Sequence, residues 1–306
     1  MYDGMINVYK EAGYTSHDVV AKLRGILHQK KIGHTGTLDP DARGVLPFCL
    51  GKGTKLCDMI TDHDKTYIAG IRFGLETDTQ DLSGQVIGRS DRVITKDMLE
   101  EALPRFTGEI DQIPPMYSAI KVDGRKLYDL AREGKVIERK ARRITIYRIR
   151  LLSSDFPEAT IEVRCSKGTY IRTLCHDLGQ VLGCGAVRSS LLRTQVGQFG
   201  LDSAMKLSEI QALSDESEEA VTEHVISLED MLSQYPKIRT VDAEGDKLLL
   251  NGNPLSKQYV TGYDAPALKA EDGQWYRVYT TDGQLVGVYT YVKAMHRFKN
   301  IKMFLS

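Results

Sequence analysis

The sequence of 306 residues has no long apolar run and no paired cysteine motif. No stretch approaches the roughly 20 apolar residues of a membrane-spanning helix, and residues 1–4 show no basic region leading into an apolar one. The five cysteines form no C-x-x-C pair, which favours reduced thiols over a metal or disulfide site. We therefore expect a cytoplasmic protein that makes no membrane contact.

A net charge is also lacking, since 41 Lys and Arg residues balance 41 Asp and Glu residues. The balance hides a segregation: residues 121–150 hold 11 basic and 4 acidic side chains, whereas residues 201–230 hold 9 acidic side chains and 1 lysine. A nucleic acid responds to a local patch of charge rather than to the sum. Charge alone does not separate an RNA-binding surface from a solvated face.

The length and the apolar share of 42% suit a globular protein of two domains. Hydrophobic periodicity predicts mixed helices and strands up to about residue 236. Beyond residue 237, short strands at 275–279 and 285–291 indicate a small β domain. The expected helices span 16–28, 95–106, 127–133, 170–182 and part of 203–223, and the expected strands span 65–73, 117–122, 143–152 and 159–165.

Several short motifs lack the context that their chemistry needs. Ser118 and Lys121 match an S-x-x-K pattern, but their segment alternates like a strand and no K-T-G follows. Residues 51–55 are glycine-rich without forming a phosphate-binding loop. Asp78 and Asp81 lie in a loop that lacks the calcium-binding pattern, so turn-capping roles are expected for them. No nucleotide, metal or cofactor site is predicted.

The loop at residues 33–47 combines glycines, an Asp39-Pro40 step and Arg43 in a short span. A residue before proline is restricted to extended geometry, so the loop should have a defined shape. Catalytic residues favour such loops. The residues alone leave an acid/base site, a nucleophile site and a structural turn open. Asp39 and Asp41 could also bind a metal, but the further oxygen ligands cannot be located.

This stretch, G-H-T-G-T-L-D-P-D-A-R-G-V-L-P, resembles the signature of the TruB family of tRNA pseudouridine synthases. The resemblance continues in family order at 65–67 (K-T-Y), 74–84 (G-x-x-T-D-T-Q-D-x-x-G), 114–121 (P-P-M-Y-S-A-I-K), 167–172 (K-G-T-Y-I-R), 177–179 (D-L-G) and 191–199. Two departures occur: Glu11 follows Lys10 where the family has proline, and Leu192 replaces an arginine.

The resemblance implies an α+β fold with a mixed, largely antiparallel sheet and flanking helices, followed by a small β-rich domain of PUA type. The catalytic domain would span 1–236 and include a basic RNA-binding arm at about 115–143. The PUA-like domain would span 237–306. The implied enzyme is a monomer that needs no cofactor, metal or obligatory protein partner.

The implied reaction is isomerisation of the T-loop uridine at tRNA position 55 to pseudouridine. The resemblance assigns the central carboxylate to Asp39, which must be ionised and would be paired with Arg172. Tyr67 would stack on the flipped base. Whether Asp39 attacks the sugar, attacks the base or removes a proton stays open. The implied substrate-binding residues are His34, Tyr170, Leu191, Lys10 and Lys121.

Three other functions remain to be separated from this one. A non-catalytic RNA-binding protein would need the basic arm but not Asp39. A guide-RNA-dependent relative would act on ribosomal RNA within a complex. A nucleoside hydrolase would use Asp39 and Asp41 as a carboxylate pair and release free uracil.

Overall fold

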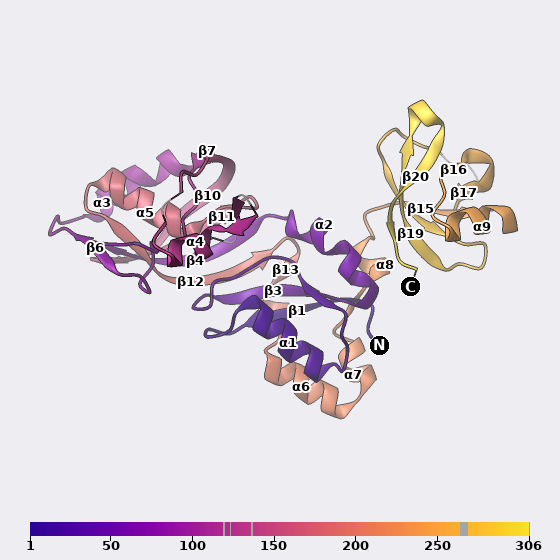
Figure 1. The fold of residues 1–306 in the computed structure, drawn as a ribbon, viewed down its shortest axis with the longest axis horizontal. Coiled ribbons are helices and arrows are strands. Elements are labelled where there is room, and N and C mark those ends of the chain that lie inside the picture. Colours follow the sequence, from indigo (N-terminus) through magenta and orange to yellow (C-terminus); the bar gives the residue numbers. More distant parts are fainter. Residues whose placement is uncertain (119, 123, 136, 264–268, 306) are drawn as a thin grey trace.

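The computed structural model describes residues 1–118, 120–122, 124–135, 137–263 and 269–305. The predicted arm at 115–143 and the predicted domain at 237–306 therefore lie partly outside the described residues. Within these ranges the chain forms a ten-stranded sheet, a six-stranded sheet and two short hairpins (Figure 1). No helix in the described ranges is both long and apolar enough to span a membrane.

The larger sheet has the order β14-β1-β3-β12-β4-β11-β10-β7, with β13 beside β12 and β2 beside β3. Every pairing is antiparallel except β12 with β3. The mixed, largely antiparallel α+β fold is thus confirmed. The strands are β1 (Gly4–Lys10), β2 (Ile32–His34), β3 (Arg43–Leu50), β4 (Lys65–Phe73), β7 (Gly108–Gln112), β10 (Arg142–Asp155), β11 (Glu158–Cys165), β12 (Ala186–Val196), β13 (Phe199–Gly200) and β14 (Ile226–Ser227).

Helices flank this sheet, and their ends follow from local sequence. The helix α1 begins after Thr15, which forms a capping box with Asp18. The helix α5 packs against β12 and ends at Gly183, whose φ of 67° suits glycine. In the described chain as a whole, including the part that holds the smaller sheet, the helices are α1 (Ser16–Ile26), α2 (Cys57–Thr61), α3 (Lys96–Ala102), α4 (Leu127–Arg132), α5 (Ile171–Leu182), α6 (Leu207–Glu216), α7 (Glu218–Thr222), α8 (Leu228–Met231) and α9 (Ala243–Leu250).

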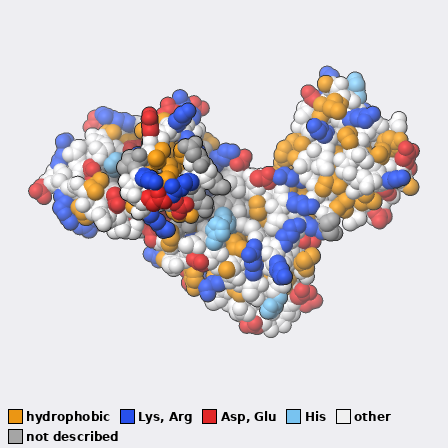
Figure 2. Space-filling view, viewed as in Figure 1, with side chains coloured by type: hydrophobic (Ala, Val, Ile, Leu, Met, Phe, Trp, Pro, Cys, Tyr) orange, Lys and Arg blue, Asp and Glu red, His pale blue; other side chains and the backbone are white. Residues whose placement is uncertain are grey.

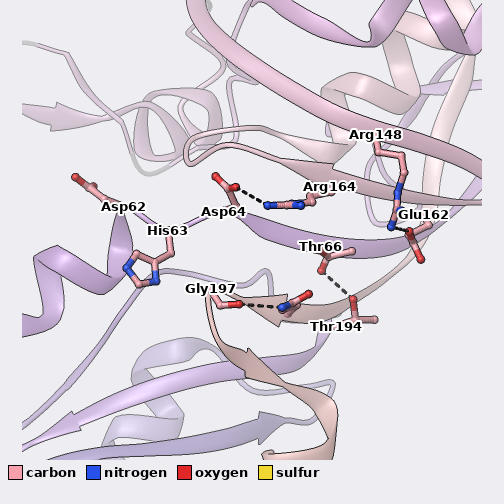
Figure 3. Close-up of a pocket in the computed structure, with 10 residues that line it drawn as sticks. Asp62, His63, Asp64, Thr66, Arg148, Glu162, Arg164, Thr194 and Gly197 are labelled. Carbon is pink, nitrogen blue, oxygen red and sulfur yellow. Dashed lines mark hydrogen bonds and ion pairs between the residues drawn. The ribbon is translucent and has the colours of Figure 1, made fainter. Parts of the chain in front are cut away.

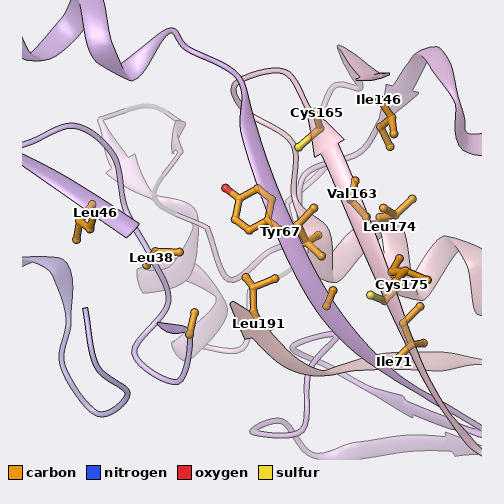
Figure 4. Close-up of a cluster of buried hydrophobic side chains, with 14 of the residues drawn as sticks. Leu38, Leu46, Tyr67, Ile71, Ile146, Val163, Cys165, Leu174, Cys175 and Leu191 are labelled. Carbon is orange, nitrogen blue, oxygen red and sulfur yellow. The ribbon is translucent and has the colours of Figure 1, made fainter. Parts of the chain in front are cut away.

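The central strand β4 shows the predicted alternation. Tyr67, Ala69, Ile71 and Phe73 are all buried on one face of the sheet. They join an apolar cluster that includes residues of β11, β12 and α5. Figure 4 shows the ring of Tyr67 among the side chains of this cluster, with Leu191 beside it. One face of β4 is thereby fixed against the core.

The strand predicted at 117–122 was wrong in extent. Among its described residues only β8 (Lys121–Val122) forms, in a hairpin with β9 (Arg125–Lys126). The other hairpin joins β5 (Leu75–Thr77) to β6 (Val86–Arg89). The carbonyl of Tyr117 instead accepts a bond from Arg172, and that of Ser118 accepts one from Tyr128 N–H. These carbonyls are therefore bonded by a side chain and by the first turn of α4 rather than by a strand ladder.

The smaller sheet forms a separate C-terminal lobe (Figure 1) with its own apolar core. It contacts the larger part of the chain through Lys302, which lies 2.6 Å from Asp58, and through Lys55 Nζ, which donates to Leu305 O at 2.8 Å. A C-terminal β domain is thus present, as expected. Its strands are β15 (Lys237–Thr240), β16 (Leu255–Ser256), β17 (Val260–Gly262), β18 (Trp275–Tyr279), β19 (Leu285–Val292) and β20 (Arg297–Met303).

Candidate active site

The loop between β2 and β3 carries Asp39 and is held from both ends. The N–H and the hydroxyl of Thr35 both donate to Pro47 O, at 3.2 and 3.0 Å. Leu38 N–H donates to Ser16 Oγ at 3.1 Å, which ties the loop to the start of α1. Gly44 has a φ of 110°, and a Cβ there would lie 2.1 Å from Arg193 O. The loop therefore has the defined shape that the sequence predicts, and Gly44 is required by close backbone approach.

Lys10 supports this loop through hydrogen bonds to backbone carbonyls. Its side chain is fully buried, and Nζ donates to the carbonyls of Ala42 at 2.7 Å, Pro40 at 3.1 Å and Glu11 at 3.2 Å. Burial lowers the pKa of Lys10 to about 8, although the nearby charges of Asp41 and Asp39 oppose this. The ammonium is directed to the loop backbone and does not line the cavity, so this placement does not support the predicted substrate contact of Lys10.

Asp39 and Arg172 lie together although 133 positions separate them. Arg172 Nε is 3.2 Å from Asp39 Oδ2, and Nη2 is 3.3 Å from Oδ1. Arg172 lies in the first turn of α5, just after Tyr170. The backbone of Tyr170 exchanges two hydrogen bonds with the side-chain amide of Gln112, at 2.8 and 3.1 Å. This contact with β7 fixes the start of α5 and hence the position of the guanidinium.

A second arginine, Arg188, contacts the same carboxylate and was not predicted from the sequence. Its Nη1 lies 2.8 Å from Asp39 Oδ2, while Nη2 lies 2.6 Å from Asp41 Oδ2 and 3.3 Å from Asp81 Oδ2. Arg172 Nη1 also reaches Asp81 Oδ2 at 3.4 Å. Two guanidinium groups and three carboxylates therefore form one contiguous network.

Asp81 is the buried carboxylate of this network, with 5% of the residue exposed. Burial opposes its ionisation, but hydrogen bonds from Ser83 and Thr79 and the charges of Arg188 and Arg172 outweigh burial and lower its pKa. We expected Asp81 to cap a turn, and it does accept bonds from Ser83 and Thr79 in its own loop. It also supports both arginines, a role that no local pattern indicates.

Arg188 was missed because no strand was predicted at residues 186–196, where β12 lies; this strand also contains a bulge. Against β4, Arg188 pairs with Ile71 and Ser190 pairs with Gly70, so that Ser189 is an extra residue. A regular strand would place residues 188, 190 and 192 on one face. The extra residue shifts the alternation and directs three side chains toward the apolar face of β4: Arg188, Leu191 and Arg193.

Tyr67 faces Arg193 across the two strands. Arg193 is buried and its Nε donates to Val45 O at 2.7 Å. Burial raises the pKa of Tyr67, and the charge of Arg193 opposes this only in part. The phenol is therefore a neutral O–H group at physiological pH, with 8% of the residue exposed.

A cavity of about 600 Å³ lies in front of these groups. Its volume suits a nucleoside-sized group. Five of the residues expected at the site line it, together with Arg188. The lining includes Leu38, Asp39, Lys65, Tyr67, Tyr117, Arg142, Arg143, Lys167, Tyr170, Arg172, Arg188, Leu191 and Arg193.

His34 lies outside this lining. Its ring packs edge-on against His17 at 5.2 Å and Phe48 at 6.5 Å between centroids. Burial and then the charge of His17 lower its pKa. Lys121 begins β8, but its side chain is outside the described part of the structure. The structure therefore brings Asp39, Tyr67, Tyr170, Arg172 and Leu191 to one cavity and leaves His34 beside the loop.

Cations at the rim of the cavity are partly paired. Arg143 Nε lies 3.1 Å from Asp111, and Lys167 Nζ lies 2.7 Å from Asp62. Both pairs are exposed, so each contributes little and can exchange for other anions. Figure 2 shows Lys, Arg, Asp and Glu side chains intermixed on the lobe that carries α4. The predicted basic arm is therefore not a surface of one charge on the described residues.

A second hollow of about 700 Å³ lies on the opposite face of the sheet (Figure 3). Thr66 and Thr194 line this hollow, and each is next in sequence to a residue that lines the cavity of Asp39, namely Tyr67 and Arg193. Its charges are paired with one another: Arg164 with Asp64 at 3.2 Å, and Arg148 with Glu162 at 2.8 Å. None of the residues predicted for the active site lines this hollow.

The cavity thus offers an anchored carboxylate, a neutral phenol and an apolar wall. A carboxylate held by guanidinium groups can act as a nucleophile or a base. No group of three or more metal-binding side chains occurs among the residues that the structure describes. The arrangement suits chemistry on a planar, uncharged ring that packs against Tyr67.

Comparisons with known proteins agree with this arrangement. Residues 24–171 match the TruB family pseudouridylate synthase (N terminal domain), and residues 172–233 match the tRNA pseudouridylate synthase B C-terminal domain. The chain is 48% identical to tRNA pseudouridine synthase B of Lachnoclostridium phytofermentans, covering 99% of this chain and 100% of the relative. It is 42% identical to tRNA pseudouridine synthase B of Clostridium acetobutylicum, covering 94% of each.

Solved structures share the fold over nearly the whole chain. The chain in "Crystal Structure of a Cbf5-Nop10-Gar1 Complex" matches with a TM-score of 0.72 and 26% identity, covering 99% of this chain and 85% of that chain. The chain in "Structure of H/ACA RNP bound to a substrate RNA containing 2'-deoxyuridine" matches with a TM-score of 0.70 at 24% identity, again covering 99% and 85%, and shows the fold alone. The full-length likeness to curated bacterial relatives places this chain in the TruB family of tRNA pseudouridine synthases, which are isomerases.

Proposed function

We propose that this enzyme converts the T-loop uridine at tRNA position 55 to pseudouridine and that Asp39 is its catalytic carboxylate. The observation that carries the proposal is the placement of Asp39, anchored by two arginines, at a cavity that Tyr67 also lines. The family membership supplies the class of reaction and substrate. The position within tRNA rests on the resemblance of the residue 33–47 loop.

The reaction is an isomerisation, so no atom is gained or lost. The bond between N1 of uracil and C1′ of ribose breaks, the base turns, and C5 bonds to C1′. The proton on C5 leaves, and N1 gains one proton. Asp39 can stabilise the detached ribose or base by covalent attack, or it can remove a proton, and then leaves unchanged. No redox step or hydrolysis occurs, which agrees with the proposed lack of a cofactor.

The target base must leave the RNA stack before Asp39 can reach it. Extrusion costs a few kcal/mol, and stacking on an aromatic face recovers part of that cost. Tyr67 and Tyr170 line the cavity and can provide such faces, while Leu191 adds an apolar surface. His34 lies beside the loop and is neutral by virtue of its lowered pKa. It can therefore occupy the position of the extruded base without adding charge.

RNA phosphates would meet cations at the rim of the cavity. Arg142, Arg143 and Lys167 line the cavity, and the first two are the last basic residues of the arm at about 115–143. Lys121 belongs to this arm as a proposed RNA contact. Backbone contacts of this kind make affinity depend on salt.

We assign residues 1–236 to the catalytic domain and residues 237–306 to a PUA-like RNA-binding domain. The six-stranded sheet begins at Lys237, which supports this boundary. The enzyme would act as a cytoplasmic monomer without an obligatory protein partner.

The test is incubation of the purified protein with an unmodified tRNA transcript, followed by mapping of pseudouridine along the RNA. We expect one modified position, 55, and no modification when that uridine is replaced by cytidine. Activity without a guide RNA separates this function from that of a guide-dependent relative. Release of free uracil would indicate a hydrolase instead.

Asp39→Asn should bind the same transcript with unchanged affinity and form no pseudouridine. Arg164→Met, on the opposite face of the sheet, is the matched control and should keep full activity. Turnover by Asp39→Ala would refute the assignment of the carboxylate. Modification by the wild-type enzyme at another uridine would refute only the choice of position.

A further inference from the structure

The network around Asp39 contains one more guanidinium than a simple carboxylate-arginine pair needs. Arg188 contacts Asp39, Asp41 and Asp81 at once, at 2.6–3.3 Å. Its side chain is fully buried, whereas that of Asp39 is 30% exposed. An arginine held inside the protein by three carboxylates is expensive to bury unless its charge is used. Its position therefore calls for a role beyond packing.

We propose that Arg188 is a positioning residue for the proposed reaction: it anchors Oδ2 of Asp39 and leaves Oδ1 for the nucleotide. This inference rests on the proposed function of Asp39. Oδ2 receives Arg188 Nη1 at 2.8 Å and Arg172 Nε at 3.2 Å. Among the described residues, Oδ1 receives only Arg172 Nη2, at 3.3 Å. Oδ1 is thus the less occupied oxygen at a carboxylate that lines the cavity.

Backbone contacts hold Arg188 in place next to the strand bulge. The backbone N–H of Arg188 donates to Gln80 O at 3.1 Å, and the backbones of Arg188 and Asp81 form an isolated β-bridge. Its Nε is buried without a hydrogen-bond partner among the described residues. The two Nη atoms, by contrast, both engage carboxylates. In the part of the chain that the structure describes, the guanidinium of Arg188 thus forms contacts through its two Nη atoms and not through Nε, which fits a side chain that points to the loop of Asp39.

The charges explain why a second cation is needed. Without Arg188, Asp39 would share its surroundings with Asp41 and Asp81 while only Arg172 contacted it directly. Like charges repel one another, so Asp39 would be pushed away from Asp41 and Asp81 and out of the position in which Arg188 holds it. The charged and titratable groups around Asp39 are Arg172 on α5, Arg188 on β12, Asp41 in its own loop, Asp81, Lys10 on β1, Tyr67 on β4 and Tyr170.

The experiment measures single-turnover rates and tRNA affinity on an unmodified transcript at pH 7.5. For Arg188→Met we expect a rate that falls on the order of 10²-fold, since a misplaced group can cost this much, with unchanged tRNA affinity. Arg188→Lys keeps the charge and should recover part of the rate, which a role in packing alone would not produce.

A second variant separates the charge from the fold. Adding Asp41→Asn to Arg188→Met removes one carboxylate together with the cation, so less repulsion acts on Asp39 and part of the rate should return. Thermal unfolding and tRNA binding check that each variant is folded. If Arg188→Met does not fold, Arg188→Lys and Arg188→Lys with Asp41→Asn carry the same comparison, and a rate that does not respond to Asp41 overturns the proposal.

The outcomes also separate this inference from the proposed function. A folded Arg188→Met variant with the wild-type rate overturns the role of Arg188 while Asp39 can still be catalytic. A loss of rate matched by lost tRNA affinity, or equal rates for Arg188→Met and Arg188→Lys, would also overturn it and assign Arg188 to packing of the cavity. Turnover by Asp39→Ala overturns the proposed function itself, whatever Arg188 does.

Discussion

Replacing Lys10 by methionine removes the ammonium that supports the loop of Asp39 while keeping most of the side-chain volume. Three carbonyls lose this donor, those of Ala42, Pro40 and Glu11, although Pro40 O still accepts a bond from Gly13 N–H. A buried carbonyl left unpaired costs ~1–3 kcal/mol, and only the bond to Ala42 is fully buried. The methionine also relieves the cost of burying a charge. We expect a net loss of about 2 kcal/mol, equivalent to a Tm roughly 4–8 °C lower.

Hydrogen exchange locates this loss. The amides of residues 36–44 should exchange faster in Lys10→Met than in the wild-type protein, while those of β4 and α5 should keep their protection. Because the loop positions Asp39, kcat should fall by at least about tenfold with little change in KM. Lys30→Met, at an exposed lysine, is the control and should change neither quantity.

The pH dependence of the free energy of unfolding tests the same role of Lys10 in a second way. The pKa of Lys10 is lowered to about 8, so the folded protein releases this proton between about pH 8 and the ordinary value of 10.5 while the unfolded chain retains it. The free energy of unfolding of the wild-type protein should therefore rise relative to that of Lys10→Met as pH increases from 8 to 9.5. Equal Tm values and equal loop exchange at pH 7.5 would refute the reasoning.

Further predictions concern Tyr67, Asp81 and the RNA contact. Tyr67→Phe should bind tRNA normally and react at least about tenfold more slowly, because the phenol is a neutral donor beside Arg193; a full rate would mean that only the ring matters. Asp81 has a lowered pKa, so its contribution to stability is present above about pH 4 and is lost as pH falls further. Urea unfolding should accordingly show a weaker acid dependence for Asp81→Asn. Raising salt from 50 to 200 mM should weaken tRNA affinity at least about tenfold, in wild type and Asp39→Asn alike; a flat curve would contradict phosphate contacts.

Part of the fold could be predicted where local signals and tertiary structure agree, but the neighbouring strands β1, β3 and β12 were not predicted. The Thr15 capping box begins α1 and Gly183 ends α5, as their patterns indicate. The alternation in β4 names its buried face correctly. The segment at 117–122 failed because its alternation was read without knowing that Arg172 would take the carbonyl of Tyr117. A contact from α5 replaces the strand partner, and no local pattern records it.

The site could be predicted only in part, and for a similar reason. Family resemblance names Asp39, Arg172 and Tyr67, and the fold brings all three to one cavity. Arg188 was missed because no strand was predicted at residues 186–196, and the bulge at Ser189 would also have broken the period of two by which a strand face is assigned. One signal was available: three aspartates in two neighbouring motif loops need more positive charge than Arg172 alone supplies. Counting carboxylates against cations would have prompted a search for another arginine.

The charge balance of the site separates catalysis from RNA affinity. The guanidinium groups that contact Asp39 are both held by carboxylates, so they are not free to bind phosphate. Phosphates must then be bound at the rim, where the ion pairs of Arg143 and Lys167 are exposed and exchangeable. Substitutions inside the network should change kcat and its pH profile, and substitutions at the rim should change KM and its salt dependence. Because the two sets share no residue, a double variant that combines one of each should show nearly additive effects on kcat/KM.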